Sequence, residues 1–251
     1  MRSAKDHLVF PLDVASRRAA QALVRLLADE VGMFKVGLEL FIRSGPDLVR
    51  WIQQAGTAKL FLDLKLHDIP VTVKRAMAQV ADLDVFCATV HCGESRAMLE
   101  AAVDGAGGRV RVLGVTVLTS TSPRELVEAG YQQRFAEDLQ PLVMRKAALA
   151  KDAGCAGVVC SGREVGAIKT AFGDGFLAVT PGIRPHGGPV AQDDQFRAVT
   201  PAMAIRGGAD YVVIGRPIRD AADPQAAART IVREIEGALD QLAAARTEAT
   251  A

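Results

Sequence analysis

The chain has 251 residues, with 30 Lys and Arg against 29 Asp and Glu, so its net charge is close to zero. A chain with this balance has no overall field to attract nucleic acid or an anionic membrane, so any anion must be bound locally. Hydrophobic residues make up 49% and aromatic residues 5%. This composition suits buried parallel strands covered by helices and disfavours an all-β sandwich.

Short apolar, β-branched segments alternate along the chain with longer amphipathic ones. The predicted strands are residues 8–14, 33–37, 59–66, 84–90, 111–118, 156–162, 176–183 and 210–216. The predicted helices are residues 15–30, 46–54, 71–81, 95–106, 136–153, 163–171 and 223–242. Repeated strand–helix order predicts a parallel sheet. Eight such units, with no glycine-rich turn after the first strand, favour a single-domain (β/α)8 TIM barrel of the α/β class over an open doubly wound sheet.

No linker or change in composition divides the chain, so residues 1–251 are expected to form one domain with flexible tails at 1–7 and 244–251. Residues 119–135 are expected to hold a short helical turn. Residues 184–195, rich in Gly and Pro, are predicted to form a mobile lid, with a plain connecting loop as the alternative.

The N-terminus lacks the apolar run of a signal peptide, and no window approaches 18 uncharged apolar residues, which predicts a cytoplasmic protein. Four cysteines lie in apolar stretches as two C-x4-C pairs, and we expect buried, reduced thiols rather than zinc ligands or disulfides. They are Cys87, Cys92, Cys155 and Cys160.

Charged residues occur where a parallel barrel should have its core. Asp13 closes the first predicted strand, Lys35 lies in the second, and Asp63 and Lys65 end the third. Strand side chains alternate between faces, so Asp63 and Lys65 are expected to point the same way and form an ion pair, with Asp68 just beyond them. An alternating set of opposite charges can stay ionised when buried. Salt bridges without a functional role, on the rim of the barrel, are the alternative.

Glycine and arginine follow the last two predicted strands, in TPGIR (180–184) and GRPI (215–218). The corresponding loops of barrel enzymes commonly bind phosphate through backbone N–H groups and a helix N-terminus. Gly215 allows close approach of the backbone, and Arg184 or Arg216 supplies a planar fork of donors. These features favour a phosphorylated small-molecule substrate.

The segments DLKLHDIP (63–70), FKVGLEL (34–40), TPGIRP (180–185) and IGRPI (214–218) together closely resemble the orotidine 5′-phosphate decarboxylase family. The resemblance runs from about Phe10 to Arg219. Its D-x-K half alone also occurs in related barrel enzymes that act on sugar phosphates, such as hexulose phosphate synthase. The full segment, followed by Thr72, is more restrictive.

The resemblance implies a catalytic tetrad and a homodimer. The tetrad would be Lys35, Asp63, Lys65 and Asp68, with Asp68 reaching into the neighbouring subunit's site and Thr72 assisting across the interface. Substrate contacts implied in the same way are Asp13 and Lys35 to the ribose hydroxyls, Thr119 to the pyrimidine, and Arg184, Gln195, Gly215 and Arg216 to the phosphate and closed lid. The lid looks longer than in relatives, so Gln192 is a rival to Gln195.

The implied reaction is the decarboxylation of orotidine 5′-monophosphate, which leaves a carbanion at C6 without an electron sink. Asp63 is expected to crowd the departing carboxylate, and Lys65 to stabilise the carbanion and protonate C6. No metal and no cofactor is expected. Two alternatives stay open: a metal-dependent sugar-phosphate lyase or aldolase on the same barrel, and a non-catalytic sensor of a phosphorylated ligand.

Overall fold

The fold is a closed barrel of parallel strands. The computed structural model describes residues 3–248 except 57, 94 and 186–198. Within these residues, neighbouring strands pair in parallel in the order β1 to β8, and β8 closes the barrel against β1. The strands are β1 (Leu8–Pro11), β2 (Met33–Gly37), β3 (Lys59–Leu66), β4 (Cys87–His91), β5 (Arg111–Val115), β6 (Gly157–Val159), β7 (Leu177–Thr180) and β8 (Tyr211–Val213). The predicted TIM barrel is therefore confirmed.

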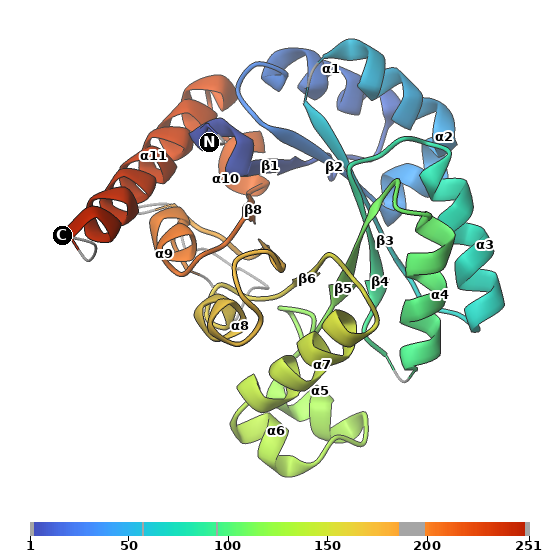
Figure 1. The fold of residues 1–251 in the computed structure, drawn as a ribbon. Coiled ribbons are helices and arrows are strands. Elements are labelled where there is room, and N and C mark those ends of the chain that lie inside the picture. Colours follow the sequence, from blue (N-terminus) through green and yellow to red (C-terminus); the bar gives the residue numbers. More distant parts are fainter. Residues whose placement is uncertain (1–2, 57, 94, 186–198, 249–251) are drawn as a thin grey trace.

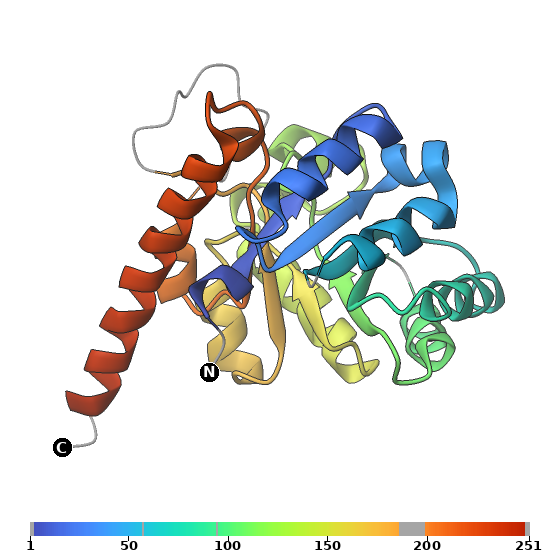
Figure 2. The same cartoon turned by 90° about the horizontal axis from the view of Figure 1, so that it is seen from above.

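Helices surround the barrel (Figures 1 and 2). They are η1 (Ala4–His7), α1 (Arg17–Leu27), α2 (Leu38–Ala55), α3 (Pro70–Ala81), α4 (Arg96–Ala106), α5 (Pro123–Glu128), α6 (Gln133–Glu137), α7 (Gln140–Asp152), α8 (Val165–Phe172), α9 (Pro201–Arg206), α10 (Arg216–Arg219) and α11 (Pro224–Glu248). The long α11 lies against η1 and α9. Through these contacts the two ends of the described chain lie on the same side of the barrel (Figure 1).

Several element boundaries differ from those predicted. α2 begins at Leu38 rather than at residue 46, because a first helical segment precedes the predicted one. The two segments meet at a kink at Gly45, whose φ is +61°. α9 and α10 were not predicted, since four to six residues carry too little periodicity to recognise. Residues 119–135 hold the short helix α5 and the beginning of a second one, α6. Residues 4–7 form η1 and α11 continues to Glu248, so helix occupies parts of both expected tails.

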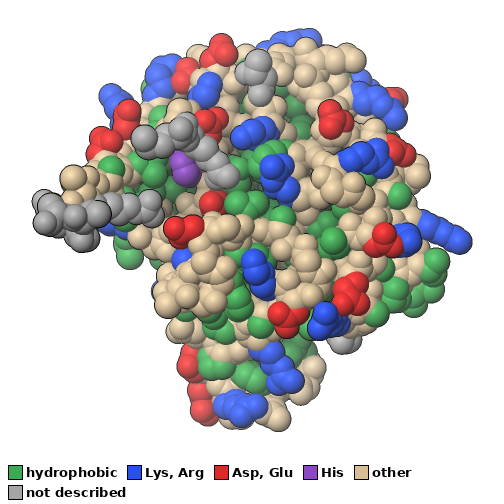
Figure 3. Space-filling model, viewed as in Figure 1, with side chains coloured by type: hydrophobic (Ala, Val, Ile, Leu, Met, Phe, Trp, Pro, Cys, Tyr) green, Lys and Arg blue, Asp and Glu red, His purple; other side chains and the backbone are tan. Residues whose placement is uncertain are grey.

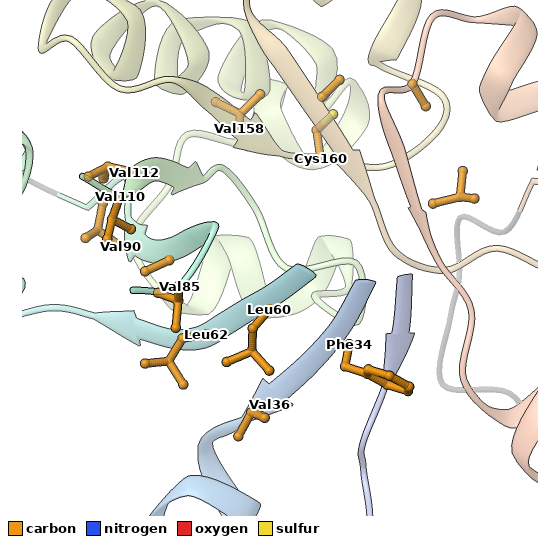
Figure 4. Close-up of a cluster of buried hydrophobic side chains, with 14 of the residues drawn as sticks. Phe34, Val36, Leu60, Leu62, Val85, Val90, Val110, Val112, Val158 and Cys160 are labelled. Atoms are coloured by element: carbon orange, nitrogen blue, oxygen red, sulfur yellow. The ribbon is translucent and has the colours of Figure 1, made fainter. Parts of the chain in front are cut away.

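Two apolar layers hold the barrel together. The larger lies between strands and helices, and Figure 4 shows some of its members, among them Phe34, Val36, Leu60 and Leu62. The smaller fills the barrel interior and consists of Val9, Met33, Phe61, Cys87, Leu113, Leu177, Val179, Tyr211 and Val213. Alternate residues of each strand thus face opposite layers, as a two-residue period requires.

The inward-facing positions change from apolar to polar towards the carboxyl ends of the strands. Two residues after Met33 comes Lys35, and two residues after Phe61 comes Asp63. Thr89 likewise follows Cys87 on β4. Because β2, β3 and β4 are consecutive in the barrel, these polar side chains meet above the apolar interior. The fold therefore gathers them at the end where barrel enzymes have their active sites.

Candidate active site

A cavity of about 260 Å³ opens at the carboxyl ends of the strands. Its walls come from every strand or following loop except those of β4. The lining residues are Pro11, Asp13, Lys35, Phe61, Asp63, Lys65, Val115, Val117, Leu118, Thr119, Ser120, Val159, Cys160, Pro181, Gly182, Arg184, Val213, Gly215, Arg216 and Arg219. This volume is close to the lower limit of about 300 Å³ for small-molecule sites.

Asp63 is the centre of a charged network on one wall. Its Oδ2 lies 2.9 Å from Lys65 Nζ and 3.4 Å from Lys35 Nζ. Lys35 Nζ also lies 3.3 Å from Asp13 Oδ1. The ion pair predicted between Asp63 and Lys65 is therefore present, and charges alternate in sign from Asp13 through Lys35 and Asp63 to Lys65.

The network keeps Asp63 ionised although the residue is only 8% exposed. Burial alone would raise its pKa, but Lys35, Lys65 and hydrogen bonds from Lys65 and Thr89 outweigh burial. The pKa of Asp63 is consequently lowered from its usual value. The site thus holds a fixed negative charge between two ammonium groups.

Lys65 reaches this network from an irregular part of β3. Its φ is +51°, and the pairing with β4 shifts register between Leu62 and Leu66. The simple alternation used to predict the side-chain direction is therefore interrupted here. The Lys65 N–H donates instead to the Thr89 hydroxyl, at 2.8 Å.

The opposite wall carries glycines and arginines from the ends of β7 and β8. Gly215 lies so close to β1 that a Cβ there would come within 2.8 Å of Pro11 Cγ. Arg184 and Arg216, both predicted, line this wall, as does Arg219. Arg219 donates from Nη1 to the Asp13 carbonyl at 2.9 Å, which connects the two walls.

The cavity has a local excess of positive charge. Five cationic side chains and two carboxylates line it, namely Lys35, Lys65, Arg184, Arg216 and Arg219 against Asp13 and Asp63. On the face of the molecule seen in Figure 3, by contrast, Lys and Arg side chains are interspersed with Asp and Glu. The structure therefore agrees with the expectation of local anion binding in a protein of balanced charge.

The structure does not bring all predicted residues to the cavity of one chain. Thr119 lines it and is 9% exposed. Asp68 and Thr72 are exposed and lie outside the lining, and Asp68 Oδ1 accepts the N–H of Ile69 at 2.6 Å. Gln192 and Gln195, and with them most of the expected lid, fall outside the described residues.

Two residues of this region were missed. Arg219 follows Arg216 by about one helical turn, and that spacing in GRPIR was a usable signal. Thr89 contacts both Asp63 and Lys65. A threonine in a buried strand cannot be distinguished by sequence from a packing residue. Its position two residues after the inward-facing Cys87 does, however, predict that its side chain points inward.

His91, at the end of β4, is not among the cavity-lining residues. Its ring centroid lies 5.9 Å from that of His67. The pKa of His91 is lowered mainly by burial and further by the nearby charges of His67, Lys65 and Lys146, while Asp63 has a smaller opposite effect. His67 lies over Gly93, where a Cβ would come within 2.5 Å of its Nε2, so the ring packs directly against the loop that follows β4.

The cysteines are buried and free, as predicted. Among the residues that the structure describes, no group of three or more His, Cys, Asp or Glu side chains is arranged to hold a metal ion. In the same part of the chain, every helix is too short or too polar to cross a bilayer.

Comparison with known proteins gives a consistent result. The family model described as orotidine 5′-phosphate decarboxylase / HUMPS family matches residues 6–231. A protein of Desulfosudis oleivorans named orotidine 5′-phosphate decarboxylase is 55% identical over 95% of this chain and 96% of its own length. One of Anaeromyxobacter sp. with the same name is 49% identical over 90% and 96%.

Solved structures extend the similarity to the fold. The crystal structure of orotidine 5′-phosphate decarboxylase from Lactobacillus acidophilus matches with a TM-score of 0.77 and 35% identity, covering 91% of this chain and 98% of that one. An uncharacterized conserved protein from Geobacillus kaustophilus matches with a TM-score of 0.76 and 38% identity, covering 91% and 99%.

Proposed function

The chain belongs to the orotidine 5′-phosphate decarboxylase / HUMPS family, and on this premise we propose that it decarboxylates orotidine 5′-monophosphate to uridine 5′-monophosphate in pyrimidine biosynthesis. One observation carries the proposal. A single cavity has the Lys35–Asp63–Lys65 network on one wall and three arginines on the other. A nucleotide with a ring carboxylate and a 5′-phosphate has an anionic group at each end, and these two groups can face the two sets of cationic side chains.

Charge supports the same orientation. The substrate carries one negative charge on its carboxylate and about 1.5 to 2 on its phosphate at neutral pH. The cavity lining has an excess of three positive side chains. The phosphate belongs at Arg184 and Arg216, where guanidinium forks match phosphate oxygens. Arg219 adds positive charge nearby, but its own fork is held by Asp220. Between these groups, residue 215 must be glycine, because a Cβ there would collide with Pro11.

The pyrimidine then lies over Asp63 and Lys65, with Thr119 at its edge and the ribose hydroxyls at Asp13 and Lys35. The C6–carboxylate bond breaks, its electron pair stays on C6, and CO2 leaves. The Lys65 ammonium stabilises this pair and transfers a proton to it, and the neutral amine is reprotonated from water. Lysine suits the role because it is a compact charge that also carries a proton.

Asp63 has two effects on this reaction. It holds the lysines in place, and it repels the substrate carboxylate by about 4 kcal/mol if the two anions approach to about 4 Å at an effective dielectric of about 20. Repulsion of this size supplies only part of the acceleration. The larger part comes from charges fixed before the reaction and from phosphate binding, whose energy aligns the ring.

An assay of the purified chain tests the proposal. Loss of orotidine 5′-monophosphate absorbance is followed with and without EDTA, and uridine 5′-monophosphate and CO2 are quantified. We expect full turnover with the chelator present. Activity lost with EDTA and restored by a divalent metal favours the sugar-phosphate lyase or aldolase alternative, and binding without turnover favours the sensor.

We also propose that the protein is a homodimer in which Asp68 and Thr72 complete the partner's site. Both residues lie on the segment after β3 beside exposed apolar side chains. Ile42 is 79% exposed and Ile69 62%, and Leu38 and Val71 are about half exposed. Exposed apolar side chains gathered on adjacent segments are typical of an interface.

Mixing two inactive variants tests this arrangement. A Lys65→Ala subunit still supplies Asp68, and an Asp68→Asn subunit still supplies Lys65. Randomly exchanged dimers should therefore recover about a quarter of wild-type activity, because half are hybrids with one complete site. No recovery after verified subunit exchange means that Asp68 acts within its own chain or not at all.

A cytoplasmic location is proposed on the chemistry of the cysteines. All four are buried free thiols, as in proteins of reducing compartments. Cell fractionation with compartment markers checks this.

A further inference from the structure

Thr89 contacts both Asp63 and Lys65 of the proposed site but does not line the cavity itself. It lies in β4, is fully buried, and has its side chain on the inner face of the barrel. Its hydroxyl donates to Asp63 Oδ1 at 2.9 Å and accepts the backbone N–H of Lys65 at 2.8 Å. One hydroxyl thus joins the carboxylate and the lysine backbone.

The carboxylate of Asp63 is held from two sides. Its Oδ2 faces the ammonium groups of Lys65 and Lys35, while Oδ1 receives the hydrogen bond from Thr89. Two attachments on different oxygens fix the rotation of the carboxylate plane, whereas contacts to Oδ2 alone would leave it free to turn. Thr89 therefore determines where the negative charge lies relative to both lysines.

The second contact holds the backbone of Lys65 in an unfavourable conformation. At φ +51° a residue with a Cβ is strained by about 1–2 kcal/mol. The register shift between Leu62 and Leu66 marks the same point in the β3–β4 pairing. The Thr89 hydroxyl accepts the N–H in this irregular stretch, so it stabilises the backbone from which the ammonium is projected.

We propose that Thr89 is a positioning residue for the decarboxylation proposed above: its hydroxyl fixes the Asp63 carboxylate and the Lys65 backbone in the geometry that places the ammonium at the reacting carbon. The inference rests on the proposed function. It predicts that loss of this hydroxyl slows the chemical step while leaving the arginine wall, and with it substrate binding, largely unchanged.

Thr89→Val is the central variant, because valine keeps the branched shape and removes both hydrogen bonds. We expect kcat to fall about 10- to 100-fold, as for loss of a hydrogen bond to a charged group, with KM changed less than about threefold. Thr89→Ser keeps a hydroxyl and should recover most of kcat. This rescue separates the hydroxyl from the packing of its methyl group.

Thr116→Val is the matched control. Thr116 directly follows β5, is 2% exposed, and donates its hydroxyl to the Val159 carbonyl at 3.0 Å, but it does not line the cavity. Its substitution should lower the melting temperature about as much as Thr89→Val does and leave kcat near the wild-type value. Thermal melting and both kinetic constants are measured for all variants.

A Thr89→Val enzyme with kcat within twofold of wild type overturns the inference, as does an equal kcat loss in Thr116→Val or a failure of serine to restore kcat. If Thr89→Val does not fold, Thr89→Ala against Thr89→Ser carries the same test. If the wild-type protein shows no turnover, both the proposed function and the role of Thr89 are refuted. If the wild type is active and Thr89→Val is equally active, only the role of Thr89 is refuted.

Discussion

Replacing Lys65 by alanine is the most direct test of the charged wall. The ammonium lies 2.9 Å from Asp63 Oδ2 and lines the cavity. A positive charge about 3.5 Å from a developing carbanion contributes about 5 kcal/mol at an effective dielectric of about 20, which corresponds to roughly 10³- to 10⁴-fold in rate. The same substitution removes the proton donor, which typically supplies about 10²- to 10⁴-fold. Since the two effects overlap, we expect kcat to fall by about 10⁴-fold or more.

The fold should tolerate this change. Asp63 keeps its contacts with Lys35 and Thr89, and the lost ion pair involves a lysine side chain that is 28% exposed. Asp63 is buried but keeps these two partners, so stability should fall by about 1–3 kcal/mol, less than for a buried charge left unpaired. The assay is steady-state decarboxylation with circular dichroism melting. Lys59→Ala, at the start of the same strand, serves as the control and should keep full activity. A Lys65→Ala protein within tenfold of wild-type kcat refutes the assigned role.

Three further predictions concern other parts of the molecule. Arg216→Ala should raise KM at least tenfold, about 1.4 kcal/mol of lost phosphate contact, with a smaller effect on kcat; unchanged KM in steady-state assays would move the phosphate site elsewhere. Because the folded-state pKa of His91 is lowered, the folded protein binds this proton less readily than the unfolded chain, so stability is lost as pH falls below about 6.5. His91→Gln should flatten melting temperature between pH 7 and 5, and an unaltered slope would contradict this. Burial raises the pKa of Cys92 and Cys155 to about 12, so mass spectrometry should find neither thiol alkylated by iodoacetamide at pH 8 in the native state, whereas rapid labelling would show that they are accessible.

The barrel could be predicted because its determinants are local and repeated. Eight apolar, β-branched segments separated by amphipathic ones leave few alternatives once the sheet is parallel. The charged wall could be predicted for a related reason. Lys35 and Asp63 occupy inward positions two residues after apolar ones, so the alternation of side chains along neighbouring strands is enough to bring them together.

The remaining features depend on interactions that the alternation of strand side chains does not predict. The left-handed backbone at Lys65 has no signal in the sequence, because positive φ is normally expected at Gly or Asn. Thr89 reads as an ordinary β-branched strand residue until its hydroxyl is seen against Asp63. Asp68 is predicted to act in the site of the neighbouring subunit, so its contacts depend on how two chains assemble and not on the strand pattern of one chain.

The strain at Lys65 bears on why alanine is the appropriate replacement there. In a regular strand the Lys65 N–H would point toward β2, the side to which the Lys59 N–H donates, and the Thr89 hydroxyl would serve Asp63 alone. The left-handed turn instead lets the hydroxyl serve both residues. Glycine at this position would relieve the strain and free the backbone to return to the regular pairing, so its effect would mix lost charge with lost geometry. Alanine retains a Cβ and the same backbone restriction, and it therefore removes the ammonium while leaving in place the constraint that aims it.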